Sequence, residues 1–86
     1  MSMTDTTALS RLCRRIELET NMVFTWSAAE DGIFLKKDLK TGPMKGKVYR
    51  RDIKDDIPDY GFEVVDWRAE DGFFVIELKE RQPDYK

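Results

Sequence analysis

The chain has 86 residues, of which 41% are hydrophobic and 37% are charged, and its formal net charge is −2. This balance excludes a disordered chain, and no apolar run is long enough to span a bilayer. We therefore expect one small domain over residues 1–86, with frayed ends at 1–5 and 81–86. Because there is no histidine and one cysteine, the sequence excludes imidazole catalysis, thiolate zinc sites and internal disulfides, and the lack of a signal peptide favours a cytoplasmic protein.

The N-terminal segment predicts an amphipathic helix. Thr4-Asp5-Thr6-Thr7 supplies side-chain oxygens that can cap the first free amides, and Thr20-Asn21 ends the helical pattern. Between them, apolar side chains recur at the spacing i, i+3, i+4, i+7, namely Leu9, Leu12, Cys13 and Ile16. A helix of three to four turns is marginal in water by itself, so we expect this apolar stripe to pack on a sheet.

After residue 21 the apolar period changes to two, which predicts a first hairpin. Strand 22–27 places Met22, Phe24 and Trp26 on one face, with Trp26 in the core. Strand 33–39 does the same for Ile33, Leu35 and Leu39. The segment 28–32 between them is typical of a turn, because Asp-Gly accommodates positive φ. A loop over 40–46 and a short strand over 47–51 follow.

A second hairpin is predicted at the C-terminal end, from strands 62–68 and 73–79, after an irregular segment 54–61 with one helical turn. A four-residue loop would pair Arg68 with Phe73, Trp67 with Phe74 and Val65 with Ile76, which buries one continuous apolar face. The opposite face then carries a second apolar set, Phe62, Val64, Phe73 and Val75. Both hairpins share the letters Trp, Ala, Glu-Asp-Gly and Phe, which indicates convergence on one turn solution.

These elements predict an α+β fold in which the N-terminal amphipathic helix packs on a twisted antiparallel meander of about five strands. The alternative is a helix followed by a small SH3-like barrel. One short helix covers one face of a sheet, so the second apolar set is either buried by closure of a barrel or exposed to a partner.

Charge is unevenly distributed along the chain. Residues 36–54 carry eight cations and two anions, a net charge of +6, whereas residues 55–86 carry a net charge of −6. We expect these blocks to neutralise each other in the folded chain, and the alternative is a positive patch beside a negative one.

No constellation of residues favours catalysis. The loop 42–48 lacks the spacing, the Ser/Thr and the following helix of a phosphate-binding loop, and the acidic run 52–63 lacks the spacing of a calcium loop. We therefore expect a non-enzymatic protein with no cofactor, no metal site and no membrane partner.

The sequence favours a small binding or regulatory module that docks on a protein partner through the second apolar face and the basic segment. The candidate binding residues are Lys45, Lys47, Tyr49, Arg50, Arg51, Phe62, Val64, Phe73 and Val75. The alternative is RNA or single-stranded nucleic acid bound through residues 36–54, with cations on the phosphates and Tyr49 stacked on a base. The acidic pI of about 5.1 weighs against that alternative. A homodimer is a third option.

Overall fold

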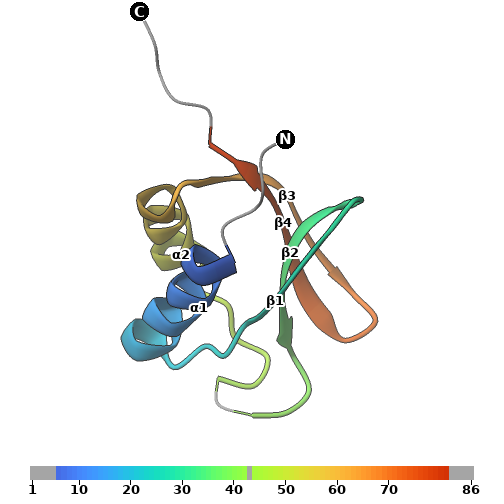
Figure 1. Cartoon of the computed structure of the whole chain (residues 1–86). Coiled ribbons are helices and arrows are strands. Elements are labelled where there is room, and N and C mark those ends of the chain that lie inside the picture. The colour runs from blue at the N-terminus through green and yellow to red at the C-terminus, as the bar shows by residue number, and fades with distance from the viewer. Residues whose placement is uncertain (1–5, 43, 82–86) are drawn as a thin grey trace, which may run out of the picture.

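The computed structural model describes residues 6–42 and 44–81. Its elements are α1 (Thr6–Thr20), β1 (Thr25–Ala29), β2 (Gly32–Asp38), α2 (Arg50–Asp56), the 3-10 helix η1 (Ile57–Tyr60), β3 (Phe62–Glu70) and β4 (Phe73–Glu80). The helices lie together on one side of the sheet (Figure 1). This arrangement confirms the α+β class, with four strands in place of the expected five.

The strands form an antiparallel sheet in the order β1-β2-β4-β3. Strands β1 and β3 are its two edges, so the sheet is open and the barrel alternative, which would need these edges to pair, is not formed. The expected fraying at 1–5 and 82–86 lies outside the described residues. Arg81 is held, since its backbone N–H donates to the carbonyl of Gly61 at 2.8 Å.

Helix α1 buries the predicted stripe. Leu9, Leu12 and Ile16 are at most 1% exposed and Cys13 is 8% exposed, and burial of each large aliphatic side chain contributes about 1.5–3 kcal/mol. The helix ends where predicted, because Asn21 takes a left-handed conformation at φ 64° and donates its backbone N–H to the carbonyl of Glu17 at 2.8 Å.

Trp26 does not enter the core, contrary to the prediction. It lies on edge strand β1 opposite Leu35 and stays 39% exposed. Met22 and Phe24, which precede the strand, are buried as predicted. An edge strand has a neighbour on one side alone, so a large side chain there is covered less than one in the middle of the sheet.

The second hairpin turns through two residues, Asp71 and Gly72, and not through four. Both have positive φ, 53° and 81°, as a tight primed turn requires, and Glu70 pairs with Phe73 across it. The predicted pairs of Arg68 with Phe73, Trp67 with Phe74 and Val65 with Ile76 are therefore wrong. At Trp67 and Arg68 the register differs by two residues, an even number, so both side chains keep their predicted faces.

A β-bulge at Val65 changes the faces in the first half of β3. Val64 pairs with Leu78 and Asp66 pairs with Glu77, which leaves Val65 as an extra residue, 50% exposed. The extra residue shifts the alternation by one, so that Phe62 and Val64 lie on the helix-covered face, which simple alternation does not predict.

Residues 47–51 do not form the expected strand. Helix α2 begins at Arg50, and Tyr49, Ile53 and Ile57 recur every four residues, which places Ile53 and Ile57 on one face. Both isoleucines are at most 1% exposed and belong to the core that α1 and the sheet also form. The apolar residues at helical spacing therefore outweigh the local strand preference of Val48 and Tyr49. The helical turn expected within 54–61 is η1, which ends at Gly61 with φ 89°.

Candidate functional site

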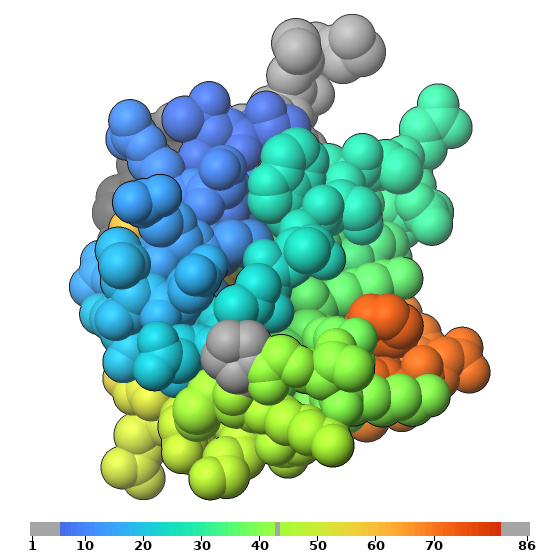
Figure 2. Space-filling model, turned by 90° about the horizontal axis from the view of Figure 1, so that it is seen from below, coloured from blue at the N-terminus to red at the C-terminus, as the bar shows by residue number. Residues whose placement is uncertain are grey.

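The loop after β2 and helix α2 carry several exposed cations and one exposed aromatic side chain. We call this group the basic surface: Lys45, Lys47, Tyr49, Arg50, Arg51 and Lys54. All six residues are exposed, and the exposed fraction of Tyr49 is 45%. In Figure 2 the yellow-green segment that contains them fills the lower part of the molecule, beside the orange turn of the second hairpin.

The cations of the basic surface have no anionic partner. In the part of the chain that the structure describes, every ion pair within 4.0 Å uses Arg15, Arg68 or Lys79 as its cation. Among the described residues, no ion pair within 4.0 Å joins the positive block 36–54 to the negative block 55–86, so the expected neutralisation does not take the form of direct ion pairs. Unpaired like charges close together raise the local potential and attract anions.

Arg50 is fixed on the sheet by aromatic rings. Its guanidinium lies 5.6 Å from the centroids of both the Trp67 and Phe74 rings, which are themselves 5.8 Å apart. Each such cation–π contact is worth about 0.5–1 kcal/mol at an exposed position. Sequence reasoning missed this cluster, because it became visible only once residues 50–56 formed a helix.

The loop before the basic surface is anchored by a buried lysine. Lys37 is 1% exposed, and its ammonium donates to the carbonyl of Met44 at 2.8 Å and to that of Asp38 at 3.4 Å. The Asp38 carboxylate accepts from the backbone N–H of Lys40 at 2.7 Å and from the Thr41 hydroxyl at 2.9 Å, and these bonds lower its pKa. Lys37 therefore has a structural role, although the charge count of residues 36–54 includes it with the exposed cations.

The far end of α2 carries paired anions. Asp56 is 5% exposed and its Oδ1 lies 3.4 Å from Arg15 Nε of α1. Burial, together with hydrogen bonding to Glu19, raises the pKa of Asp56 to about 6, and the same hydrogen bond lowers the pKa of Glu19. A protonated Asp56 can therefore donate to the Glu19 carboxylate and join the two helices.

The outer face of the sheet carries a cluster of ion pairs, and the predicted second apolar set does not assemble on it. Arg68 Nη1 lies 3.0 Å from Asp66 Oδ2 and 3.5 Å from Glu77 Oε1, and its guanidinium is 5.8 Å from the Phe34 ring centroid. Beside this cluster, Val75 is 1% exposed. At this exposure Val75 cannot contribute to a contact with a partner.

The other three residues of that predicted face are dispersed. Phe62 is 2% exposed in the core and Val64 packs against the core, because the bulge turns them onto the helix-covered face. Phe73 alone is exposed, at 40%, on the outer face. The five predicted residues of segment 45–51 are all exposed, whereas Phe73 is the one exposed residue of the four predicted apolar ones.

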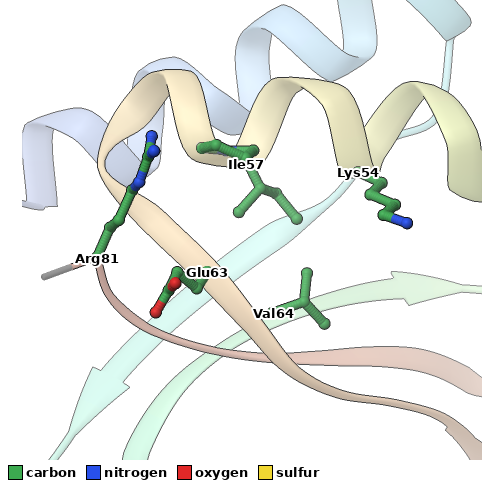
Figure 3. A pocket seen from close by; sticks show the side chains of 6 residues that line it. Lys54, Ile57, Glu63, Val64 and Arg81 are labelled. Atoms are coloured by element: carbon green, nitrogen blue, oxygen red, sulfur yellow. The ribbon is translucent and has the colours of Figure 1, made fainter. Parts of the chain in front are cut away.

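A hollow of about 360 Å³ lies at the Lys54 end of the basic surface. Figure 3 shows Ile57 and Val64 between Lys54 at one end and Glu63 with Arg81 at the other. An apolar floor with charges at both ends suits one apolar side chain that carries polar neighbours. The hollow adds an apolar contact to a surface that otherwise offers charge.

Other chemistry has little support in the geometry. Within residues 6–42 and 44–81, no group of three or more ligating side chains is placed to hold a metal ion, and no helix is long and apolar enough to cross a membrane. Burial raises the pKa of the Cys13 thiol to about 11, so it is protonated and unreactive at neutral pH.

Comparison with protein-family models, curated proteins and solved structures gives no match for this chain. The geometry alone therefore carries the functional proposal.

Proposed function

We propose that this chain is a small non-catalytic docking module whose basic surface binds an acidic segment of a protein partner. The observation that carries the proposal is the group of exposed cations, Lys45, Lys47, Arg50, Arg51 and Lys54, which form no ion pair within 4.0 Å among residues 6–42 and 44–81. Exposed charges of one sign steer an oppositely charged partner and set its orientation. Tyr49 supplies the aromatic contact that is enriched at protein interfaces.

Helix α2 itself supports a short acidic segment over a nucleic acid. Asp52, Asp55 and Asp56 lie on the same seven-residue helix as Arg50 and Arg51. A nucleic-acid strand repeats its phosphate charge along its whole length, so a strand crossing α2 brings phosphates against these carboxylates. A peptide carries its charges where its sequence places them. Its acidic run can therefore end where the cations of α2 give way to the carboxylates.

The hollow at Lys54 supports a peptide for a second reason. It lies within reach of the basic surface and its floor is formed by aliphatic side chains, Ile57 and Val64. We expect the bound segment to combine a run of Asp or Glu with one apolar anchor residue, since buried anchors supply most of the affinity of a small interface. We place this interaction in the cytoplasm, on the basis of one buried free cysteine.

The experiment is a fluorescence-anisotropy titration with two labelled probes, an acidic peptide of alternating Glu and Asp with one Leu, and an oligouridine of equal charge. We expect the peptide to bind more tightly, and its affinity to fall between about 50 mM and about 150 mM salt because the contacts are exposed. The double variant Arg50→Glu/Arg51→Glu should weaken peptide binding about tenfold or more.

The matched control is Arg11→Glu/Arg14→Glu, which changes the net charge equally on exposed positions of α1. It should change the affinity less than about twofold, since these residues are outside the basic surface. Equal losses in both double variants would mean that net charge alone attracts the peptide. Tighter binding of oligouridine would support the nucleic-acid alternative instead.

A further inference from the structure

Strand β1 is an open sheet edge. Its five residues, Thr25–Ala29, pair with β2 in an unbroken register, and four of the five are exposed. Among the described residues, no backbone hydrogen bond from another segment reaches β1. None of its side chains is charged. An exposed strand edge without charge, proline or bulge is a template for another strand.

The opposite edge of the same sheet is protected. Strand β3 contains the bulge at Val65 and carries charged side chains along its length, Glu63, Asp66, Arg68 and Glu70. Bulges and charges are the usual features that prevent pairing at an edge. The two edges therefore differ, and the open one is β1.

The charges at the two ends of β1 suit a second copy of this chain. Lys36 is the strand partner of Thr25, and Arg14 and Glu17 line a hollow with Thr25, so this end of β1 has two cations and one anion near it. At the other end, Ala29 is followed directly by the two anions of Glu30-Asp31. An antiparallel pair of β1 strands brings the positive end of each copy to the negative end of the other.

We infer that β1 of one copy pairs antiparallel with β1 of a second copy, about a twofold axis near Ser27, to form one continuous sheet across a homodimer. Trp26, which is 39% exposed, then lies opposite the small Ala28 of the second copy and becomes covered. Such an isologous contact closes on itself and leaves no free β1 edge. The basic surface on α2 is not part of this contact.

The test is sedimentation equilibrium of the whole chain from about 5 μM to about 1 mM. We expect the mean mass to rise with concentration from the chain mass of 10.1 kDa towards twice that value. Ser27→Lys and Ser27→Glu should each raise the dimer Kd by about fivefold or more, because two like charges then lie opposite each other. An equimolar mixture of the two variants should restore association, which misfolded variants cannot do.

The control is Val65→Lys, at an exposed position on the β3 edge, which should leave the dimer Kd unchanged, as should Arg50→Glu/Arg51→Glu. A constant mass of 10.1 kDa over the whole range would overturn the inference. So would a loss of association by Val65→Lys equal to that by Ser27→Lys, or a mixture of the two Ser27 variants that does not associate.

Discussion

The two ends of helix α2 hold charge in different ways. At its first turn, Arg50 and Arg51 are exposed and form no ion pair with another described residue, and the helix begins without a side-chain cap. At its last residue, Asp56 is buried against α1 and lies 3.4 Å from Arg15. Cations at a helix N-terminus oppose the helix dipole, whereas Asp52 in the same turn interacts favourably with it. The last residue of α2 is thus a buried carboxyl group that contacts α1 and titrates near neutral pH, whereas its first turn holds exposed cations, of which Arg50 contacts the Trp67 and Phe74 rings.

The largest expected effect on the free energy of unfolding comes from truncating Ile53, which packs α2 against the core. Ile53 is 0% exposed beneath the middle of the helix, and Ile53→Ala should lower the free energy of unfolding by about 2–4 kcal/mol because it leaves a cavity. Urea denaturation followed by tryptophan fluorescence measures this loss. A change below about 0.5 kcal/mol, the range of surface substitutions, would mean that α2 does not pack as described.

A smaller effect is expected at the buried cation that anchors the loop. Lys37→Met keeps the side-chain length but removes the donor to the Met44 carbonyl, so the free energy of unfolding should fall by about 1–2 kcal/mol. Limited proteolysis within 39–47 should become faster at the same time. The control is Lys36→Met on the exposed neighbouring residue, which should change neither quantity.

The anionic end of α2 predicts a dependence of stability on pH. The pKa of Asp56 is raised to about 6 from the ordinary value of 3.8, so the folded chain binds this proton more tightly than the unfolded chain. Its contribution to stability is therefore present at low pH and is lost as pH rises from about 4 to about 6. Asp56→Asn should remove this component from urea midpoints measured between about pH 4 and about pH 7, which is about one unit beyond the upper pKa. An unchanged pH dependence in that variant would contradict the assignment.

The smallest expected effect is at the cationic end. Arg51→Glu should raise the free energy of unfolding by about 0.5 kcal/mol, because a carboxylate is favourable at a helix N-terminus. Lys54→Glu, in the last turn, should lower it by a similar amount for the opposite reason. Differential scanning calorimetry of the two variants gives the signs. Loss of stability in both would mean that Arg51 has a structural partner.

The elements with a regular apolar period could be predicted from the sequence. The α1 stripe from Leu9 to Ile16 is specified by local spacing, and in the second hairpin Trp67, Phe74 and Ile76 keep their predicted side of the sheet. Alternation cannot reveal an inserted residue, so the bulge at Val65 and the burial of Phe62 were missed. Both depend on pairing with another strand.

The candidate site could be predicted in part. Segment 45–51 was identified from its charges, since charge and exposure are properties of single residues. The ring contacts of Arg50 and the burial of Lys37 arise from tertiary packing. The spacing of Tyr49, Ile53 and Ile57 did contain the signal for α2, but it was outweighed by the strand preference of Val48 and Tyr49.

The most direct test of the basic surface is amide-resolved NMR during titration with the acidic peptide. We predict that chemical-shift changes concentrate in residues 45–51 and at Lys54, and are small at Asp56 and around Arg68 on the outer face of the sheet. Changes centred on the Arg68 cluster or on the α1 stripe, with residues 45–51 unaffected, would contradict the proposed docking site.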